Sequence, residues 1–193
     1  MPAVKNDIFS KFMVPFMQWY LTMIAVTVVI DYILHRVGWV HMGIYLGYLG
    51  TALVISSFIY SLRKRKIIQS GTPKKLLQWH EYGAWIGTIF ILVHAGIHFN
   101  AILPWLAVLM MLLTVASGLV GKYILKKATE SFRIKKQELL DAGKTPAEID
   151  QVLLFDAVTV EAMKKWRVVH MPITYFLAIF SIIHIITAIM YGA

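Results

Sequence analysis

Four histidines in two apolar segments are the residues of this sequence best suited to do chemistry. His80 and His94 are fourteen residues apart in one segment, and His170 and His184 have the same separation in another. Fourteen residues are just under four helical turns, so the imidazoles of each pair share a helix face, about 40° apart and roughly 21 Å apart along the axis. Two parallel helices would bring them together as two facing pairs. The spacing predicts two bis-histidine haems, the inner iron held by His80 and His170 and the outer by His94 and His184.

Membrane-spanning helices must position these histidines. The chain has 193 residues, of which 59% are hydrophobic and 15% charged, with apolar stretches of about 20 residues, the length of a transmembrane helix. The sequence predicts an all-α integral membrane protein with one membrane domain, residues 1–193. Spans two to five would form a haem-binding four-helix bundle, with one extra N-terminal span. The predicted spans are residues 16–34, 40–62, 76–99, 101–125 and 168–191, and residues 126–167 are expected to form a cytoplasmic helical hairpin.

The 19 Lys and Arg residues indicate the orientation of the chain. All of them except Arg36 lie before the first span, in the link that follows span two, or between Lys122, near the end of span four, and Arg167, just before the last span. The positive-inside rule then places the N-terminus inside and the C-terminus outside, which suits the inner membrane of a bacterium or archaeon. The net charge of +9 therefore favours contact with membrane lipid or an acidic partner, and we expect no nucleic acid.

The absence of cysteine limits the cofactors that this chain could bind. It excludes thiolate-ligated iron–sulfur clusters, covalent c-type haem and Cys-based zinc sites within this chain. The predicted cofactors are two haem b groups, with a quinone as a further candidate. An iron with two histidine ligands has no vacant site for oxygen or substrate, so its natural role is one-electron transfer.

A flat macrocycle between helices needs small neighbouring residues. Close helix–helix packing explains any single glycine of this chain equally well, and the two uses are compatible. Arg167, just before the last span, is the basic residue most expected to contact a haem propionate. The candidate glycines are Gly47 in span two, Gly83 and Gly87 in span three, and Gly118 in span four.

His98 complicates the assignment of the outer haem. It is five whole turns from His80 and better aligned with it than His94 is, but that spacing does not match the other helix, so His94 is retained as the ligand. His98, His41 and His35 are expected to cluster near the outer interface. Histidines facing lipid headgroups explain such a cluster. A propionate contact, a quinone partner, a metal site or a third haem are the alternatives.

The histidine pattern resembles that of the ferric reductase-like transmembrane domain, shared by NADPH oxidases, metalloreductases and their bacterial relatives. Those proteins have an inside N-terminus and histidine pairs on the third and fifth spans, which match His80, His94, His170 and His184. The cytochrome b subunits of quinol-oxidising respiratory complexes carry a similar double spacing in a four-helix bundle. The resemblance covers about residues 40–191 and is one of architecture and spacing. A sixth span and a flavin- or nucleotide-binding domain are missing, so we expect no self-contained NADPH-driven reductase.

The residues and the resemblance together predict a membrane electron-transfer subunit of a larger oxidoreductase. It would connect a quinone pool, or a soluble redox subunit with flavin, iron–sulfur or c-type haem, to an acceptor across the membrane. Two alternatives remain open. One is a stand-alone reductase of ferric iron or oxygen at the outer face, and the other is a non-redox, proton-coupled membrane protein whose histidines relay protons.

Overall fold

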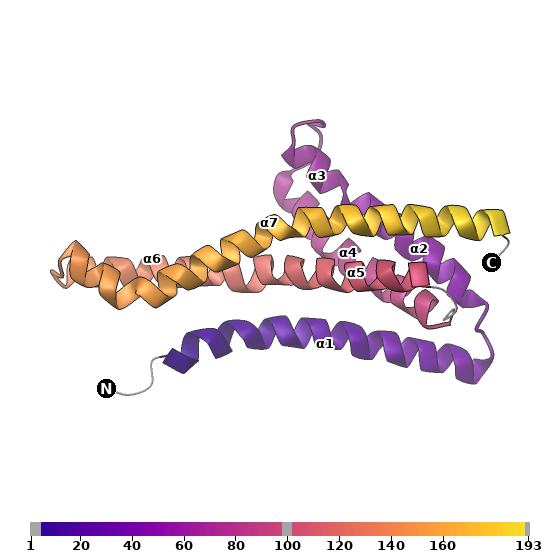
Figure 1. Cartoon of the computed structure of the whole chain (residues 1–193), viewed down its shortest axis with the longest axis horizontal. Coiled ribbons are helices and arrows are strands. Elements are labelled where there is room, and N and C mark those ends of the chain that lie inside the picture. The colour runs from indigo at the N-terminus through magenta and orange to yellow at the C-terminus, as the bar shows by residue number, and fades with distance from the viewer. Residues whose placement is uncertain (1–4, 98–101, 192–193) are drawn as a thin grey trace. The chain divides into compact units, whose positions relative to one another are not determined.

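The computed structural model describes residues 5–97 and 102–191, and every regular element in these ranges is a helix (Figure 1). Helices are expected of long apolar stretches, because a helix satisfies its backbone polar groups within one segment. The helices are α1 (Lys5–Val37), α2 (Met42–Ser57), α3 (Ile59–Lys64), α4 (Pro73–Ile97), α5 (Ile102–Leu119), the π-helix η1 (Val120–Leu125), α6 (Lys126–Asp141) and α7 (Pro146–Tyr191).

Among the described residues, four helical segments are long and apolar enough to cross a membrane. Few of their residues are buried within the protein, and large apolar side chains such as Val28, Ile55 and Ile189 are exposed. So much exposed apolar surface is stable against lipid and costly against water. The four segments are Met13–Val37, Met42–Lys64, Ile102–Tyr123 and Val168–Tyr191.

The fifth predicted span, residues 76–99, falls on α4. This helix has 25 residues, enough to cross a hydrocarbon core of about 30 Å, but its described part is less apolar than the other four segments and is not among them. Its polar residues, including Lys74, Lys75, His80, Glu81 and His94, account for the difference. Two of these polar residues, His80 and His94, are the predicted haem ligands. Because α4 is not among the four apolar segments, a fifth span remains a prediction.

By contacts between residues, the chain divides into two compact units. Residues 1–20 and 116–174 form the first unit, and residues 21–115 and 175–193 form the second. The helices α1, α5 and α7 each contribute residues to both units.

In the second unit, α2 and α4 pack closely where two glycines face each other. A Cβ atom on Gly50 would lie 2.7 Å from the carbonyl oxygen of Gly87, and a Cβ on Gly87 would lie 2.8 Å from the carbonyl oxygen of Gly50. Only residues without a side chain allow the two backbones this approach, which is the small-residue packing typical of membrane helices.

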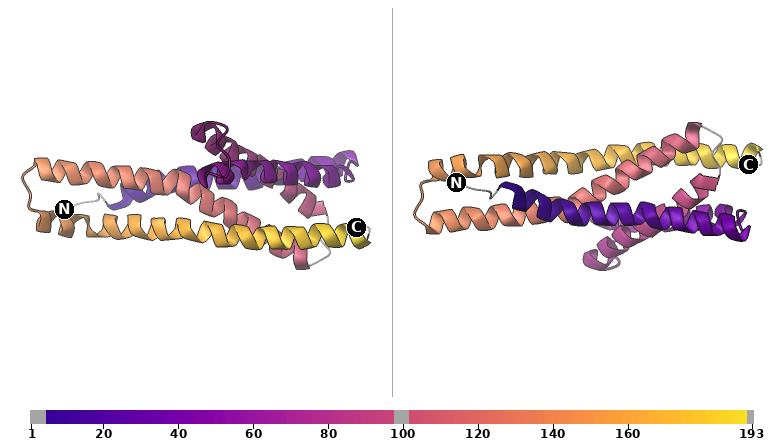
Figure 2. Two further views of the ribbon diagram at one scale, coloured as in Figure 1. Left: turned by 90° about the horizontal axis from the view of Figure 1, so that it is seen from above. Right: turned by 90° about the horizontal axis from the view of Figure 1, so that it is seen from below.

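In the first unit, α6 and the first half of α7 lie side by side as a helical hairpin (Figure 2). Gly143 adopts the left-handed conformation (φ 77°) in the turn, a backbone shape that glycine takes without strain. The backbone N–H of Lys144 donates to the carbonyl of Leu139 at 3.1 Å, which closes the end of α6.

A capping box begins α7. The backbone N–H and the hydroxyl of Thr145 both donate to Oε2 of Glu148, each at 2.8 Å. Pro146 takes the first helical position, where its missing N–H costs nothing. From there α7 runs for 46 residues, so the second arm of the hairpin and the last candidate span are one continuous helix.

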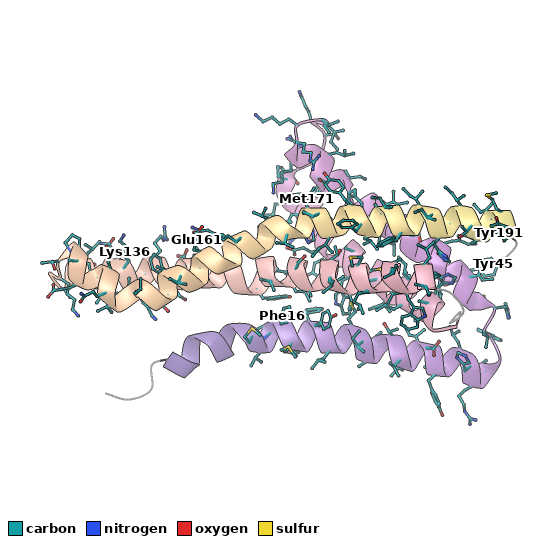
Figure 3. The ribbon with its side chains drawn as sticks, viewed as in Figure 1. Phe16, Tyr45, Lys136, Glu161, Met171 and Tyr191 are labelled. Atoms are coloured by element: carbon teal, nitrogen blue, oxygen red, sulfur yellow. The ribbon has the colours of Figure 1, made fainter. Side chains whose placement is uncertain are left out.

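Apolar packing and one ion pair hold the hairpin together. Lys135 Nζ lies 3.0 Å from Asp156 Oδ2 between α6 and α7, while Ile149 and Leu153 are buried. In Figure 3, Lys136 and Glu161 mark the two arms. Nearer the candidate spans, buried Val160 packs against five partly buried residues of the same unit: Met13, Phe16 (labelled in Figure 3), Val120, Tyr123 and Phe132.

The glycine contact predicts the effect of adding one methyl group. Gly87→Ala should destabilise the protein by about 1–3 kcal/mol, because its Cβ would meet backbone that cannot rotate away. Gly83→Ala is the matched control on the same helix, since a Cβ there has only ordinary contacts, the nearest at 3.6 Å. Thermal unfolding in detergent should show a lower Tm for Gly87→Ala and an unchanged or higher Tm for Gly83→Ala. Equal Tm values would contradict the close approach.

The capping box predicts a pH-dependent start of α7. The two hydrogen bonds from Thr145, the backbone one first, lower the pKa of the Glu148 carboxyl. A lowered folded-state pKa means that the stabilisation is present above the usual carboxyl pKa and is lost as the pH falls through the folded value. Glu148→Ala should therefore speed amide exchange, corrected for intrinsic rates, in the first turn of α7 at neutral pH and have little effect in acid. Glu138→Ala on α6 serves as an exposed control, and equal effects at both pH values would disprove the assignment.

Candidate functional site

The outer histidine pair comes together within the second unit. His94 on α4 and His184 on α7 have ring centroids 6.3 Å apart, with the ring planes at 46°. These residues are 90 positions apart in the sequence, and both rings are partly buried. The structure thus brings together the two histidines that the sequence predicts as ligands of the outer iron, and the iron itself stays a prediction.

A hydrogen bond from α2 orients the His94 ring. Its Nδ1 atom donates to the backbone carbonyl of Gly43 at 3.1 Å. A carbonyl can only accept, so Nδ1 carries the proton and the ring lone pair is on Nε2, the nitrogen with which the imidazole would bind iron. Metal-bound histidines usually have this arrangement, in which the second nitrogen donates to a carbonyl or carboxylate.

Gly47 provides the space for the same ring. A Cβ atom on Gly47 would lie 2.8 Å from Cγ of His94 and 3.0 Å from its Cδ2. The sequence analysis singled out Gly47 as a small neighbour of a macrocycle, and in the structure it is the small neighbour of the imidazole itself.

The spacing of the two rings fits an iron between them. Two imidazoles bound to one metal from opposite sides, with bonds of about 2 Å, have ring centres roughly 6 Å apart. The 6.3 Å between His94 and His184 matches that value. Their mutual tilt is compatible as well, because each axial ring can turn about its own bond to the metal.

His80, in the second unit, is held in the same way as His94. Its Nδ1 donates to the carbonyl of Ser57 at 3.2 Å, and its ring lies 5.6 Å from that of Tyr60. Ser57 is the last residue of α2, where carbonyls lack a donor within the helix. This acceptor is therefore supplied by the break between α2 and α3.

Contacts between α2 and α4 recur every seven residues along both antiparallel helices. Seven residues are two helical turns, so the contacts form one straight seam. Each histidine lies two turns from the central glycine contact. The pairs are His94 with Gly43, Gly87 with Gly50, and His80 with Ser57.

His170 belongs to the first unit. Its Nδ1 makes a short hydrogen bond with the hydroxyl of buried Ser117 on α5. Thr174, one turn further along α7, donates its hydroxyl to the carbonyl of His170 at 2.7 Å. A Cβ on Gly118 would lie 3.9 Å from Cε1 of the ring, an ordinary contact. Because His80 and His170 fall in different units, their pairing around an inner haem stays a prediction.

The remaining predicted residues have varied positions. Gly87 serves helix packing, whereas Gly83 contacts Trp79 and Leu53. His98 and the side chain of Arg167 lie outside the described part of the structure, so their predicted roles stay predictions.

His35 lies in the last turn of α1 and His41 directly before α2, and both are exposed. His35 Nδ1 donates to the carbonyl of Asp31 at 2.9 Å and lies 3.6 Å from Asp31 Oδ2. Among the described residues, no three His, Asp or Glu side chains form a group that could hold a metal ion. A third metal site with three such ligands therefore has no support among the described residues. A third haem would need only two protein ligands, like the other two, and with His98 outside the described part it stays a prediction.

The hydrogen-bond partners of the histidines were not among the residues predicted from the sequence. One signal was present, since small residues recur at seven-residue steps in Gly43, Gly50 and Ser57, as His80, Gly87 and His94 do in the next helix. Matching the two series would have predicted the seam. Ser117 directly precedes the candidate Gly118 in the sequence, but its position alone does not indicate a contact with His170.

Comparison with family models, with curated proteins and with solved structures finds no match to this chain. The resemblance to haem-binding membrane domains therefore rests on the four histidines and their spacing.

The contact between Gly47 and His94 can be tested by a double-mutant cycle. Gly47→Ala should lower stability by about 1–3 kcal/mol through overpacking. In a His94→Ala background the same change should cost much less, because the ring that the methyl group would meet is gone. Unfolding in detergent, measured for the four proteins of the cycle, gives the coupling. Additive effects would show that Gly47 does not make room for this ring.

Proposed function

We propose that this protein is a dihaem b-type cytochrome of the membrane, the electron-transfer subunit of a larger oxidoreductase. The observation that carries the proposal is the facing pair His94 and His184, with ring centroids 6.3 Å apart. The Nδ1 bond of His94 to a backbone carbonyl gives its Nε2 the lone pair a metal needs. His80 has the same Nδ1 arrangement, fourteen residues earlier on α4.

In this proposal each chain binds two haem b groups. His94 and His184 are the ligands of the outer iron, and His80 and His170 of the inner. Haem with two axial histidines supplies one-electron transfer. Backbone carbonyls of α2 orient the imidazoles of His80 and His94 and select their tautomer. The apolar candidate spans support a position in a membrane, and the positive-inside rule favours the basic links on the cytoplasmic side.

The proposed partners lie at the two ends of this path. On the basic face, a quinone pool or an acidic redox subunit with flavin, iron–sulfur or c-type haem would exchange electrons with the inner haem. Exposed Lys64, Arg65 and Lys66 form part of that face. The opposite end would meet an acceptor or a second partner.

A second candidate function has one specific observation in its favour. Asp31 lies in the candidate span Met13–Val37. Its Oδ1 atom is buried and has no hydrogen-bond partner among the described residues, while Oδ2 is near His35. Ionisable groups inside spans are typical of proton pathways, which would suit a proton-coupled membrane protein without haem.

Optical spectroscopy separates the two functions. The purified protein should show b-type bands in a reduced-minus-oxidised spectrum and about two haems per chain by pyridine haemochrome assay. His94→Ala and His184→Ala should each remove one haem, because loss of either ligand opens the same iron. His35→Ala is the control and should keep both. A folded, colourless protein from haem-supplied cells would reject the cytochrome and favour proton coupling.

A further inference from the structure

The hydrogen bond between Ser117 and His170 differs in kind from those of the other two histidines. His80 and His94 donate to backbone carbonyls, of Ser57 and Gly43. His170 is instead bonded through Nδ1 to a side-chain hydroxyl. Ser117 is 1% exposed, so water does not compete for this bond. A backbone carbonyl is present whatever the residue, but a hydroxyl can be removed by mutation.

The surroundings of His170 keep the ring and the backbone in place. The Thr174 hydroxyl, on a residue that is also buried, holds the His170 carbonyl at 2.7 Å. On the other helix, the π-helix η1 begins at Val120, three residues after Ser117. Single π-turns within α-helices occur frequently at functional sites, because they change the register of the residues that follow. Ser117 and Gly118, which both face His170, lie in the last turn of α5, directly before η1 begins.

The chemistry of a hydroxyl lets Ser117 act on a metal ligand. A serine in a helix can direct its own proton to a carbonyl one turn back, and its oxygen then accepts from Nδ1–H of His170. When the serine oxygen accepts this hydrogen bond, the imidazole becomes a stronger electron donor through Nε2. A stronger donor stabilises ferric iron more than ferrous iron and so lowers the reduction potential.

We propose that Ser117 is a positioning residue for His170, which fixes the tautomer of this ligand and lowers the reduction potential of the inner haem. The inference rests on the proposed function, since it requires His170 to be a haem ligand. The Nδ1 proton stays on the ring in both oxidation states, and the couple remains the one-electron exchange between ferric and ferrous iron.

The test is a spectroscopic redox titration of the full-length protein and its Ser117→Ala variant. In Ser117→Ala, one of the two midpoint potentials should rise by up to about 59 mV. For a one-electron couple this corresponds to a tenfold change in the redox equilibrium constant. The other midpoint should not move. Ser117→Thr keeps the hydroxyl and should restore the wild-type value. If Ser117→Ala fails to fold or loses the inner haem, Ser117→Cys, with nearly the same volume and a weak acceptor, should show a smaller rise.

Thr27→Val is the matched control. It removes a hydroxyl that donates to the carbonyl of Met23, one turn back in the same helix, at 2.9 Å. Thr27 lies on α1, which carries none of the proposed haem ligands, so both midpoints should stay unchanged.

The outcomes separate this inference from the proposed function. Two bound haems whose midpoints are the same in wild type, Ser117→Ala and Ser117→Cys would overturn the role of Ser117 and leave the cytochrome intact. Equal shifts in Ser117→Ala and Thr27→Val would also overturn it, because the effect would then come from any lost hydroxyl. Absence of haem from the wild-type protein would instead reject the proposed function.

Discussion

The close approach of α2 and α4 at Gly50 and Gly87 is the contact on which the histidines of α4 depend. An imidazole N–H in an apolar segment costs several kcal/mol if it has no acceptor. The acceptors of His80 and His94 are backbone carbonyls of the neighbouring helix, and a carbonyl does not extend beyond the backbone as a side chain does. The two helices must therefore lie almost backbone to backbone.

The same contact gives the imidazoles their chemical form. Donation from Nδ1 to a carbonyl selects one tautomer and leaves the lone pair on Nε2. The seven-residue steps of the seam repeat this arrangement two turns to either side of the glycines, so that two histidines about 21 Å apart along one helix are oriented alike. In the first unit, the hydrogen-bond partner of His170 Nδ1 is a side chain, the hydroxyl of Ser117, and not a backbone carbonyl.

Much of the fold could be predicted because its signals are local. Apolar stretches predicted the helices, and the order Thr145, Pro146, Ala147, Glu148 is typical of the cap that begins α7. The small residues were harder to interpret, since a glycine that admits another backbone, such as Gly87, looks the same in sequence as one that admits a ring, such as Gly47. The fifth span illustrates a conflict between signals, because the histidines that suggest a site on α4 also lower its apolarity.

By itself, the sequence determined the helical character, the apolar segments and the fourteen-residue histidine spacing, because periodicity and composition act within one segment. The tertiary structure decided that His94 meets His184, that α2 supplies the acceptors and that Ser117 serves His170. Every residue carries the same backbone carbonyl, so the residue types in the sequence do not indicate which carbonyl will accept a hydrogen bond from a histidine. That choice is made only when two helices pack, by how near their smallest residues let them come.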